Sequence, residues 1–225
     1  MIEKANVSGG IKAWKMLGNN IDGDCVVAAY YHILMAKNMV HVSWLKKMAY
    51  RLGFRAPGPQ FALEEYTAYL ATLNEKPGPE QGVAVEGWLA WQESQGKVTA
   101  WAQVRNPETP DFEARVRQAM VDFGGVILAG GLSKNAYNNW GPGTCWEYDP
   151  NVPGDQSDPN LGHAIAMLAC QPTKDYAVTW GYWQTMSVAF RQANMTGAFV
   201  YLHADDEKLP DYADRLAKMN ALKAL

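Results

Sequence analysis

Apolar positions recur with a helical period through most of the first 96 residues. The run CVVAAYYHILMAK, residues 25–37, is apolar on nearly all sides, which predicts a fully buried helix. Asp22 or Asp24 can cap its start, and Asn38 is expected to end it. Further segments between Pro- and Gly-rich turns predict helices over 43–53, 61–76 and 83–96.

The pattern changes near residue 97. Short apolar runs bounded by turn residues predict strands over 97–104, 125–131, 163–170, 176–181 and 198–203. Helical periodicity returns over 111–124 and 211–225. The segment 133–162 is polar and rich in Gly, Pro and Asn, which predicts a long surface loop. The chain therefore predicts an α+β fold, with a helical half followed by a β-rich half.

Composition and charge narrow the classes of function. The 225 residues are 48% apolar, enough for a substantial core, and the net charge of −3 comes without a basic stripe. We therefore expect no nucleic-acid partner. The N-terminus MIEKANVSGG lacks a signal-peptide core, and no apolar run is long enough to span a bilayer. We expect no signal peptide, no membrane contact, and a cytoplasmic or virion-associated protein.

The three cysteines are Cys25, Cys145 and Cys170. An odd number leaves at least one thiol free, and the sequence does not decide whether Cys145 and Cys170 pair. None of the three lies in a CxxC or Cys/His spacing typical of metal sites. We therefore expect neither a metal nor a cofactor.

Cys25 stands at the start of the first predicted helix, after the stretch GNNIDGD. Free N–H groups and the helix dipole favour a thiolate at that position, so Cys25 is a candidate nucleophile. The carboxylate of Asp24 acts in the opposite direction. The alternative is a small buried residue that opens a core helix.

A nucleophilic thiol needs a base. His32 lies about 10 Å along the helix axis from Cys25, too far to take its proton, and we interpret it as a packing residue. His163 begins a predicted strand after the long loop and is the candidate base. For the oxyanion, the backbone N–H of Cys25 is one donor. Asn19 is a candidate second donor, or simply a turn residue.

This order of features resembles papain-like cysteine peptidases. GGVILAGG, GHAIAML and YAVTWGYW are similar to that family's strands, and Trp180-Gly181 matches its Trp-Gly pair. The resemblance implies one two-lobed domain over 1–225, with the cleft between Cys25 and His163. Its parts would be a helical lobe, a β-rich lobe and a C-terminal helix, over 1–96, 97–205 and 206–225. It also implies that Asn19 lies in the oxyanion hole and that Trp180 shields the histidine.

A closer resemblance is to small bacterial and actinobacteriophage proteins of this class. They carry a Gly-Asn-Asp-x-x-Gly-Asp-Cys opening and a histidine seven residues after the cysteine. Here the corresponding residues are Gly18 to Cys25, with Asn20 in place of the Asp, and then His32. This resemblance adds the possibility of a bacteriophage protein.

One position departs from the papain-like pattern. The family's orienting Asn falls at Val178, which has no polar side chain. Thr179 follows, but alternation along a strand would point it to the opposite face, and Asp175 precedes the strand. Thr179 and Asp175 are therefore the candidates for a third member of the site.

Three hypotheses follow. The first is a cysteine peptidase or amidase in which His163 takes the Cys25 proton, giving a thiolate–imidazolium pair that attacks a peptide or protein substrate. The second is a papain-like fold without catalysis, which serves as a virion structural protein or binds a protein partner. The third is another Cys/His chemistry, such as transglutaminase-like or cell-wall amidase activity.

Overall fold

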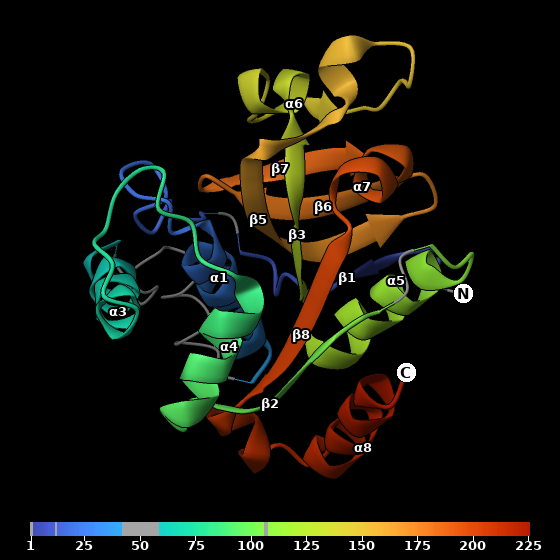
Figure 1. Cartoon of the computed structure of the whole chain (residues 1–225). Helices are drawn as coiled ribbons and strands as arrows, with labels where there is room; N and C mark the ends of the chain where they lie inside the picture. The colour runs from blue at the N-terminus through green and yellow to red at the C-terminus, as the bar shows by residue number, and fades with distance from the viewer. Residues whose placement is uncertain (1, 12, 42–58, 106–107) are drawn as a thin grey trace.

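A mixed β-sheet runs through the molecule and carries helices on both faces (Figure 1). The computed structural model describes residues 2–11, 13–41, 59–105 and 108–225. The described strands are β1 (Ala5–Asn6), β2 (Val98–Gln103), β3 (Val126–Ser133), β4 (Cys145–Trp146), β5 (Ser157–Gln171), β6 (Lys174–Thr179), β7 (Tyr182–Ser187) and β8 (Gly197–His203). The described helices are α1 (Cys25–His41), α3 (Pro59–Thr72), α4 (Val85–Ser94), α5 (Phe112–Phe123), α6 (Lys134–Asn138), α7 (Val188–Asn194) and α8 (Tyr212–Lys223), with short 3₁₀ turns η1 (Pro153–Asp155) and η2 (Ala204–Lys208). The α+β class predicted from the sequence is confirmed.

The strand order within the described residues is β2-β8-β3-β5-β6-β7-β4, with β1 paired to β5. The pairs are antiparallel except β4 with β7. The long central strand β5 therefore has neighbours on both sides. Figure 1 shows α1, α3 and α4 on one side of the sheet and α5 on the other.

The second half of β5, from Ala164 to Cys170, is apolar without interruption because both of its faces are buried. Ala164, Ala166 and Leu168 pack into the core on the α1 side. Ile165 and Met167, which alternate with them, pack into a second core that includes α5. The sheet thus separates two hydrophobic cores and contributes side chains to both. Packing on both faces fixes the positions of the β5 side chains.

Helix α1 lies against β5 and is buried from Val26 to Lys37 except at the half-buried Leu34, as its apolar sequence predicts. It begins at Cys25, and the Asp24 carbonyl accepts the N–H of Ala28 at 2.9 Å. Its end was predicted at Asn38 but lies at His41. An asparagine costs only about 0.5 kcal/mol in a helix interior, so it does not end a helix that packing stabilises.

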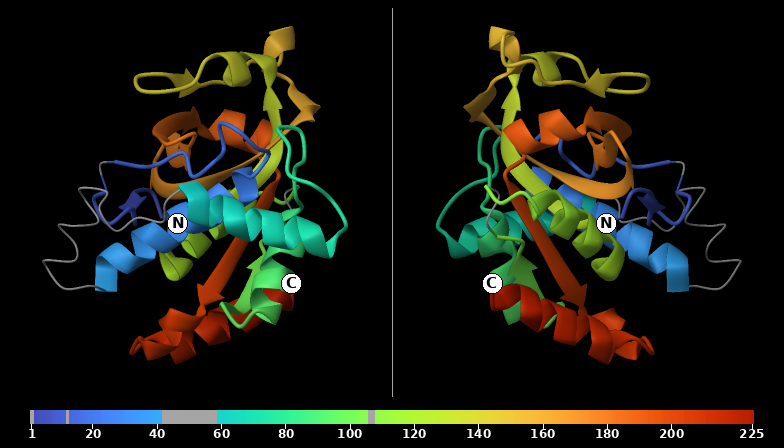
Figure 2. Two further views of the ribbon diagram at one scale, coloured as in Figure 1. Left: turned by 90° about the vertical axis from the view of Figure 1, so that its left-hand side faces the viewer. Right: turned by 90° about the vertical axis from the view of Figure 1, so that its right-hand side faces the viewer.

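The predicted loop over 133–162 contains regular structure instead. Ser133 caps α6 by accepting the N–H of Ala136 at 3.2 Å, and β4 and η1 follow. This segment projects beyond one end of the sheet, at the top of both views in Figure 2. Strand β5 starts at Ser157, so His163 lies inside the strand rather than at its beginning. Asn, Ser and Pro suit caps and short turns as well as loops, which is why composition alone misplaced this region.

Further elements that were not predicted include β1, β7 and the helix α7 that Ser187 caps. The predicted helix over 43–53 and the side chain of His41 lie outside the described residues. The helices over 59–72 and 85–94 confirm the third and fourth predicted helices. The division into two lobes near residue 97 stays a prediction.

None of the helices in the described part of the chain combines the length and the apolar character needed to cross a membrane.

Candidate active site

Cys25 is the first residue of α1, where the helix N–H groups have no partners within the helix. It is a free thiol in a half-buried position. Its sulfur lies against the backbone N–H of Ala164 in β5, which favours the thiolate. Burial outweighs this effect and raises the pKa of Cys25 to about 11, and Asp24 adds to the increase. The resting side chain is therefore a neutral thiol.

His163 precedes Ala164 in β5 and pairs with Gly130 of β3. It is 9% exposed. Burial lowers the pKa of its imidazole to about 3, so the ring is neutral near pH 7. The thiolate–imidazolium pair expected from the sequence is thus not the resting state.

Thr179, the last residue of β6, holds the imidazole in place. Its Oγ1 lies 2.7 Å from His163 Nε2. Val178, at the position of the papain-like Asn, is fully buried in the core instead. Thr179 points to the opposite face of β6 from Val178, as the alternation predicts. His163 lies on that same face, because it alternates in β5 with Ala164, which packs with Val178 into the α1-side core.

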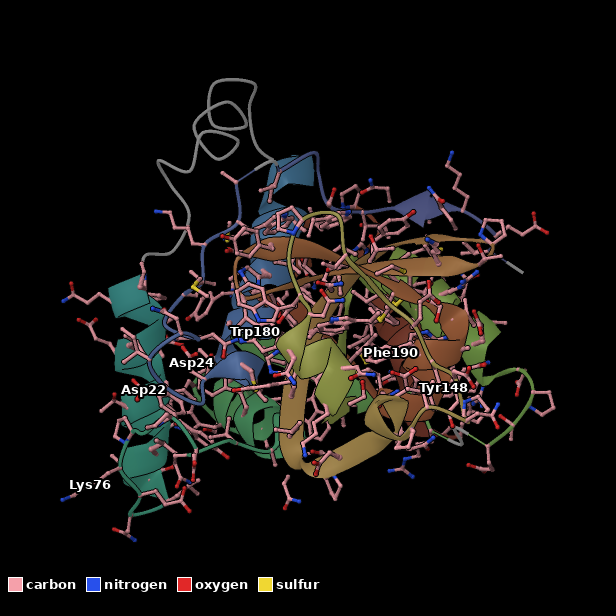
Figure 3. The ribbon with its side chains drawn as sticks, turned by 90° about the horizontal axis from the view of Figure 1, so that it is seen from above. Asp22, Asp24, Lys76, Tyr148, Trp180 and Phe190 are labelled. Atoms are coloured by element: carbon pink, nitrogen blue, oxygen red, sulfur yellow. The ribbon has the colours of Figure 1, made fainter. Side chains whose placement is uncertain are left out.

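The turn after Thr179 places an indole over the imidazole. Trp180 and Gly181 form the two-residue connection between β6 and β7, with φ of 45° and 73°. Positive φ at both residues is characteristic of a type I′ hairpin, and a tryptophan adopts it only under strain. The Trp180 ring stacks on His163 with centroids 4.4 Å apart and planes at 21°. Trp180, labelled in Figure 3, therefore covers one face of the imidazole.

Cys25 and His163 line the same open cavity of about 420 Å³. The cavity lies where the start of α1, the start of α4 and the strands β3, β5 and β8 meet. Its lining is Cys25, Val26, Gly82, Val83, Ala84, Val85, Glu86, Gln103, Ala129, Gly130, Gly162, His163, Ala164, Thr196, Gly197 and Phe199. The residues from α4 and the turn before it were missed by sequence analysis, because no local pattern indicates which helix end will face a cysteine far away along the chain.

Asn19 occupies the loop before α1 and is half-exposed. Its backbone N–H donates to the Met16 carbonyl at 3.1 Å. It does not line the cavity that holds Cys25 and His163. The structure therefore places Cys25 and His163 in the lining of one cavity and Thr179 and Trp180 in contact with His163, and it leaves Asn19 outside that lining.

Asp175 has another role. Its carboxylate is fully buried and accepts from Arg117 Nη2 at 3.0 Å and Arg191 Nε at 2.7 Å. Glu113 also pairs with both arginines. This buried ion cluster neutralises charge in the core, and its partners explain why Asp175 does not orient His163.

His32 is a packing residue, as its distance from Cys25 suggested. Its Nε2 lies 2.7 Å from the Lys15 carbonyl oxygen, and its ring meets Trp14 edge-on. Burial lowers the pKa of His32 to about 4.

Asp24 is an unusual neighbour for a nucleophile. It is completely buried, and neither carboxylate oxygen has a hydrogen-bond partner within the described residues. Burial, followed by repulsion from Asp22, raises the pKa of Asp24 to about 8. Figure 3 shows Asp22 and Asp24 next to each other in the loop beside α3. Asp24 is therefore mostly protonated at pH 7 and opposes the Cys25 thiolate only weakly.

No protein-family model matches the chain. The comparison with curated proteins gives no match. Among solved structures, a cysteine protease from Carica candamarcensis in complex with E-64 aligns with 12% identity and a TM-score of 0.45. The alignment covers 89% of this chain and 98% of that one. A similarity this low carries no argument, so the assignment of function rests on the geometry of the site.

The Thr179 hydroxyl can be tested directly. Thr179→Val keeps the branched shape but removes the Oγ1 that lies 2.7 Å from His163. If His163 is the base, we expect kcat/KM to fall roughly 10- to 100-fold, because the ring loses its fixed tautomer and orientation. Thr179→Ser should restore most of the rate. Thr185→Val, on β7 outside the cavity, is the matched control, and an equal loss there would contradict a positioning role for Thr179.

A substitution at Gly162 tests whether the substrate occupies the cavity. A Cβ at this position would meet no atom within 4 Å, so Gly162→Leu should fold normally and fill space beside His163. We expect an unchanged melting temperature and a loss of turnover of about tenfold or more, because the substrate no longer reaches the attack position. Gly78→Leu, at an equally open glycine outside the cavity, should lose nothing. Full activity of Gly162→Leu would show that substrates bind elsewhere.

Proposed function

We propose that this protein is a thiol hydrolase of peptide or amide bonds, of the papain-like cysteine peptidase class. The observation that carries the proposal is the shared cavity, whose lining includes both Cys25 at a helix N-terminus and His163 with its anchored imidazole. These are the nucleophile and the base that acyl transfer requires. The substrate would be a peptide or protein.

The neutral resting state determines how the proton moves. A buried thiol and a buried imidazole both favour their uncharged forms here. We infer that His163 removes the Cys25 proton as the sulfur attacks, rather than beforehand. The base then acts in the transition state, as in general-base catalysis by serine hydrolases.

The remaining steps follow from the hydrogen bonds of His163. If Nε2–H donates to Thr179 Oγ1, Nδ1 carries the lone pair that takes the thiol proton. The sulfur bonds to the carbonyl carbon, and the C–N bond then breaks as His163 returns the proton to the leaving amine. Water adds to the thioester with His163 again as base, which releases the acid and restores the thiol.

The oxyanion would lie at the start of α1, where the backbone N–H of Cys25 points away from the helix. We retain Asn19 as the proposed second donor because it belongs to the loop that leads into Cys25. Its side chain would have to turn from its half-exposed position toward the first turn of α1.

A second candidate function, binding without catalysis, is favoured by a different observation. The pKa of Cys25 is raised and that of His163 is lowered, the opposite of a preformed ion pair. A papain-like fold that lost catalysis, and binds a partner or contributes to a virion, would show this pattern. Such a protein would use the cavity for binding without turnover.

The experiment that separates the two is capture of the acyl-enzyme. The protein is incubated with a library of peptide amides, quenched in acid, digested and mapped by mass spectrometry. We expect acyl groups on Cys25 that neutral hydroxylamine removes, with Cys145 unmodified as an internal control. Retention of peptides by the protein with no acylated Cys25 and no turnover would contradict the hydrolase and support the binding protein.

A further inference from the structure

Besides the proposed catalytic pair, the part of the chain that the structure describes adds one residue with an ionic side chain to the cavity lining. Glu86 lies in the first turn of α4, lines the cavity and is exposed. It forms no ion pair within the described residues. A carboxylate that borders a ligand cavity and has no cation of its own is available to a cationic group of a ligand.

The rest of the lining leaves this charge uncompensated. Within the described residues no Lys or Arg lines the cavity, and its other polar side chains, Gln103 and Thr196, are neutral. Burial keeps Cys25 and His163 uncharged near pH 7. The cavity therefore has a net negative charge that comes from Glu86, and a positively charged substrate group is favoured over a neutral or negative one.

The cavity is also graded from apolar to polar. Its deepest residues are the nearly fully buried Val26, Val85, Ala164 and Phe199. Glu86 and Thr196 are exposed and therefore lie at its mouth. A lysine or arginine side chain has the same order of properties, since an aliphatic stem that covers apolar surface ends in a cation that stays near water.

We propose that this cavity is a specificity pocket for lysine or arginine side chains, with Glu86 binding the cationic group. The proposal rests on the proposed hydrolase function for its placement next to a scissile amide. It identifies the substrate class as basic peptides. The binding preference itself does not need turnover, and the two claims can therefore fail separately.

The first test measures binding to a protein that cannot turn over. Cys25→Ala protein is mixed with four peptide libraries that differ in one fixed residue, Lys, Arg, norleucine or Glu. Norleucine has nearly the shape of lysine without its charge. We expect the Lys and Arg libraries to be retained about tenfold more than norleucine at low salt, and less so at high salt.

Glu86→Gln in the Cys25→Ala background should abolish that preference, and Glu86→Lys should shift it toward the Glu library. Glu93→Gln, an exposed glutamate at the other end of the same helix, is the matched control and should change nothing. Equal retention of Lys and norleucine libraries, or a preference that survives Glu86→Gln, overturns the proposal.

The second test uses protein with Cys25 intact. If the hydrolase proposal holds, kcat/KM should be about tenfold higher for lysine than for norleucine substrates, and Glu86→Gln should remove the difference. A binding preference that depends on Glu86, together with no turnover of any library, would overturn the hydrolase and leave the basic-ligand pocket standing. Turnover that does not depend on Glu86 would support the hydrolase and overturn the basic-ligand pocket.

Discussion

Cys25→Ala should lose amide hydrolysis by a factor of about 10⁴ or more, since the attacking atom is gone and only binding and oxyanion stabilisation remain. His163→Ala should lose nearly as much, because no other imidazole among the described residues lines the cavity. The double variant should be little worse than either single variant, since the two groups act as a unit. The measurement is kcat/KM on the best peptide amide found by library screening.

Controls for this prediction come from the other thiols and histidines. Cys145→Ser and His32→Gln each change a residue outside the cavity and should retain activity if the fold survives. Melting temperatures of all variants identify losses that come from unfolding. Activity that persists in Cys25→Ala, or that disappears in Cys145→Ser at unchanged stability, would contradict the assignment of the nucleophile.

The second large effect concerns stability and comes from Asp24. Its carboxyl is fully buried without a hydrogen-bond partner, and its pKa is raised from 3.8 to about 8. The unfolded chain releases this proton near pH 4, whereas the folded chain holds it until about pH 8. Between those values the unfolded state binds fewer protons, so the free energy of unfolding falls as the pH rises.

The expected slope is at most about 1.4 kcal/mol per pH unit, or roughly 4 kcal/mol lost by pH 7. Asp24→Asn removes this term because it has nearly the same shape and no charge. We expect the variant to resemble the native protein near pH 4 and to be more stable by several kcal/mol at pH 8. Urea unfolding between pH 4 and 9 measures both curves.

Asp214→Asn serves as the control, since Asp214 is an exposed member of a surface ion pair with Lys218. It should leave the slope between pH 4 and 8 unchanged. If native protein and Asp24→Asn show parallel curves across this range, the buried carboxyl is ionised or solvated, and the account of its burial is wrong.

The elements that the sequence predicts well are those with an unambiguous hydrophobic period. The segment from Cys25 to Lys37 in α1 and that from Ala164 to Cys170 in β5 are apolar on nearly all sides because packing encloses them, and both were recognised. Their ends were less accurate, since Asn38 and the residues before His163 have weak preferences that tertiary packing overrides. Strand β7 was missed because YWQTMS is half-exposed and because the sequence before it has no typical turn dipeptide.

The candidate site was only partly predictable. Cys25 and His163 could be selected by their positions on predicted elements, and the structure places them in one cavity. The contact between Thr179 and His163 depends on the register of β5 and β6, and the stacking of Trp180 on His163 depends on a hairpin that local propensity disfavours. Glu86 and the burial of Asp24 depend on how α4 and α3 pack, information that spacing along the chain does not contain.

The most direct test of the central claim, that Cys25 and His163 act as a pair, is the pH dependence of Cys25 alkylation by iodoacetamide. The background is Cys145→Ser with Cys170→Ala, so that one thiol reports, and it is compared with and without His163→Ala. We predict a thiol pKa above the free value of about 8.5 in both proteins, and a rate at pH 7 about tenfold higher or more when His163 is present. The same rate and the same pH profile with and without His163 would contradict the pair.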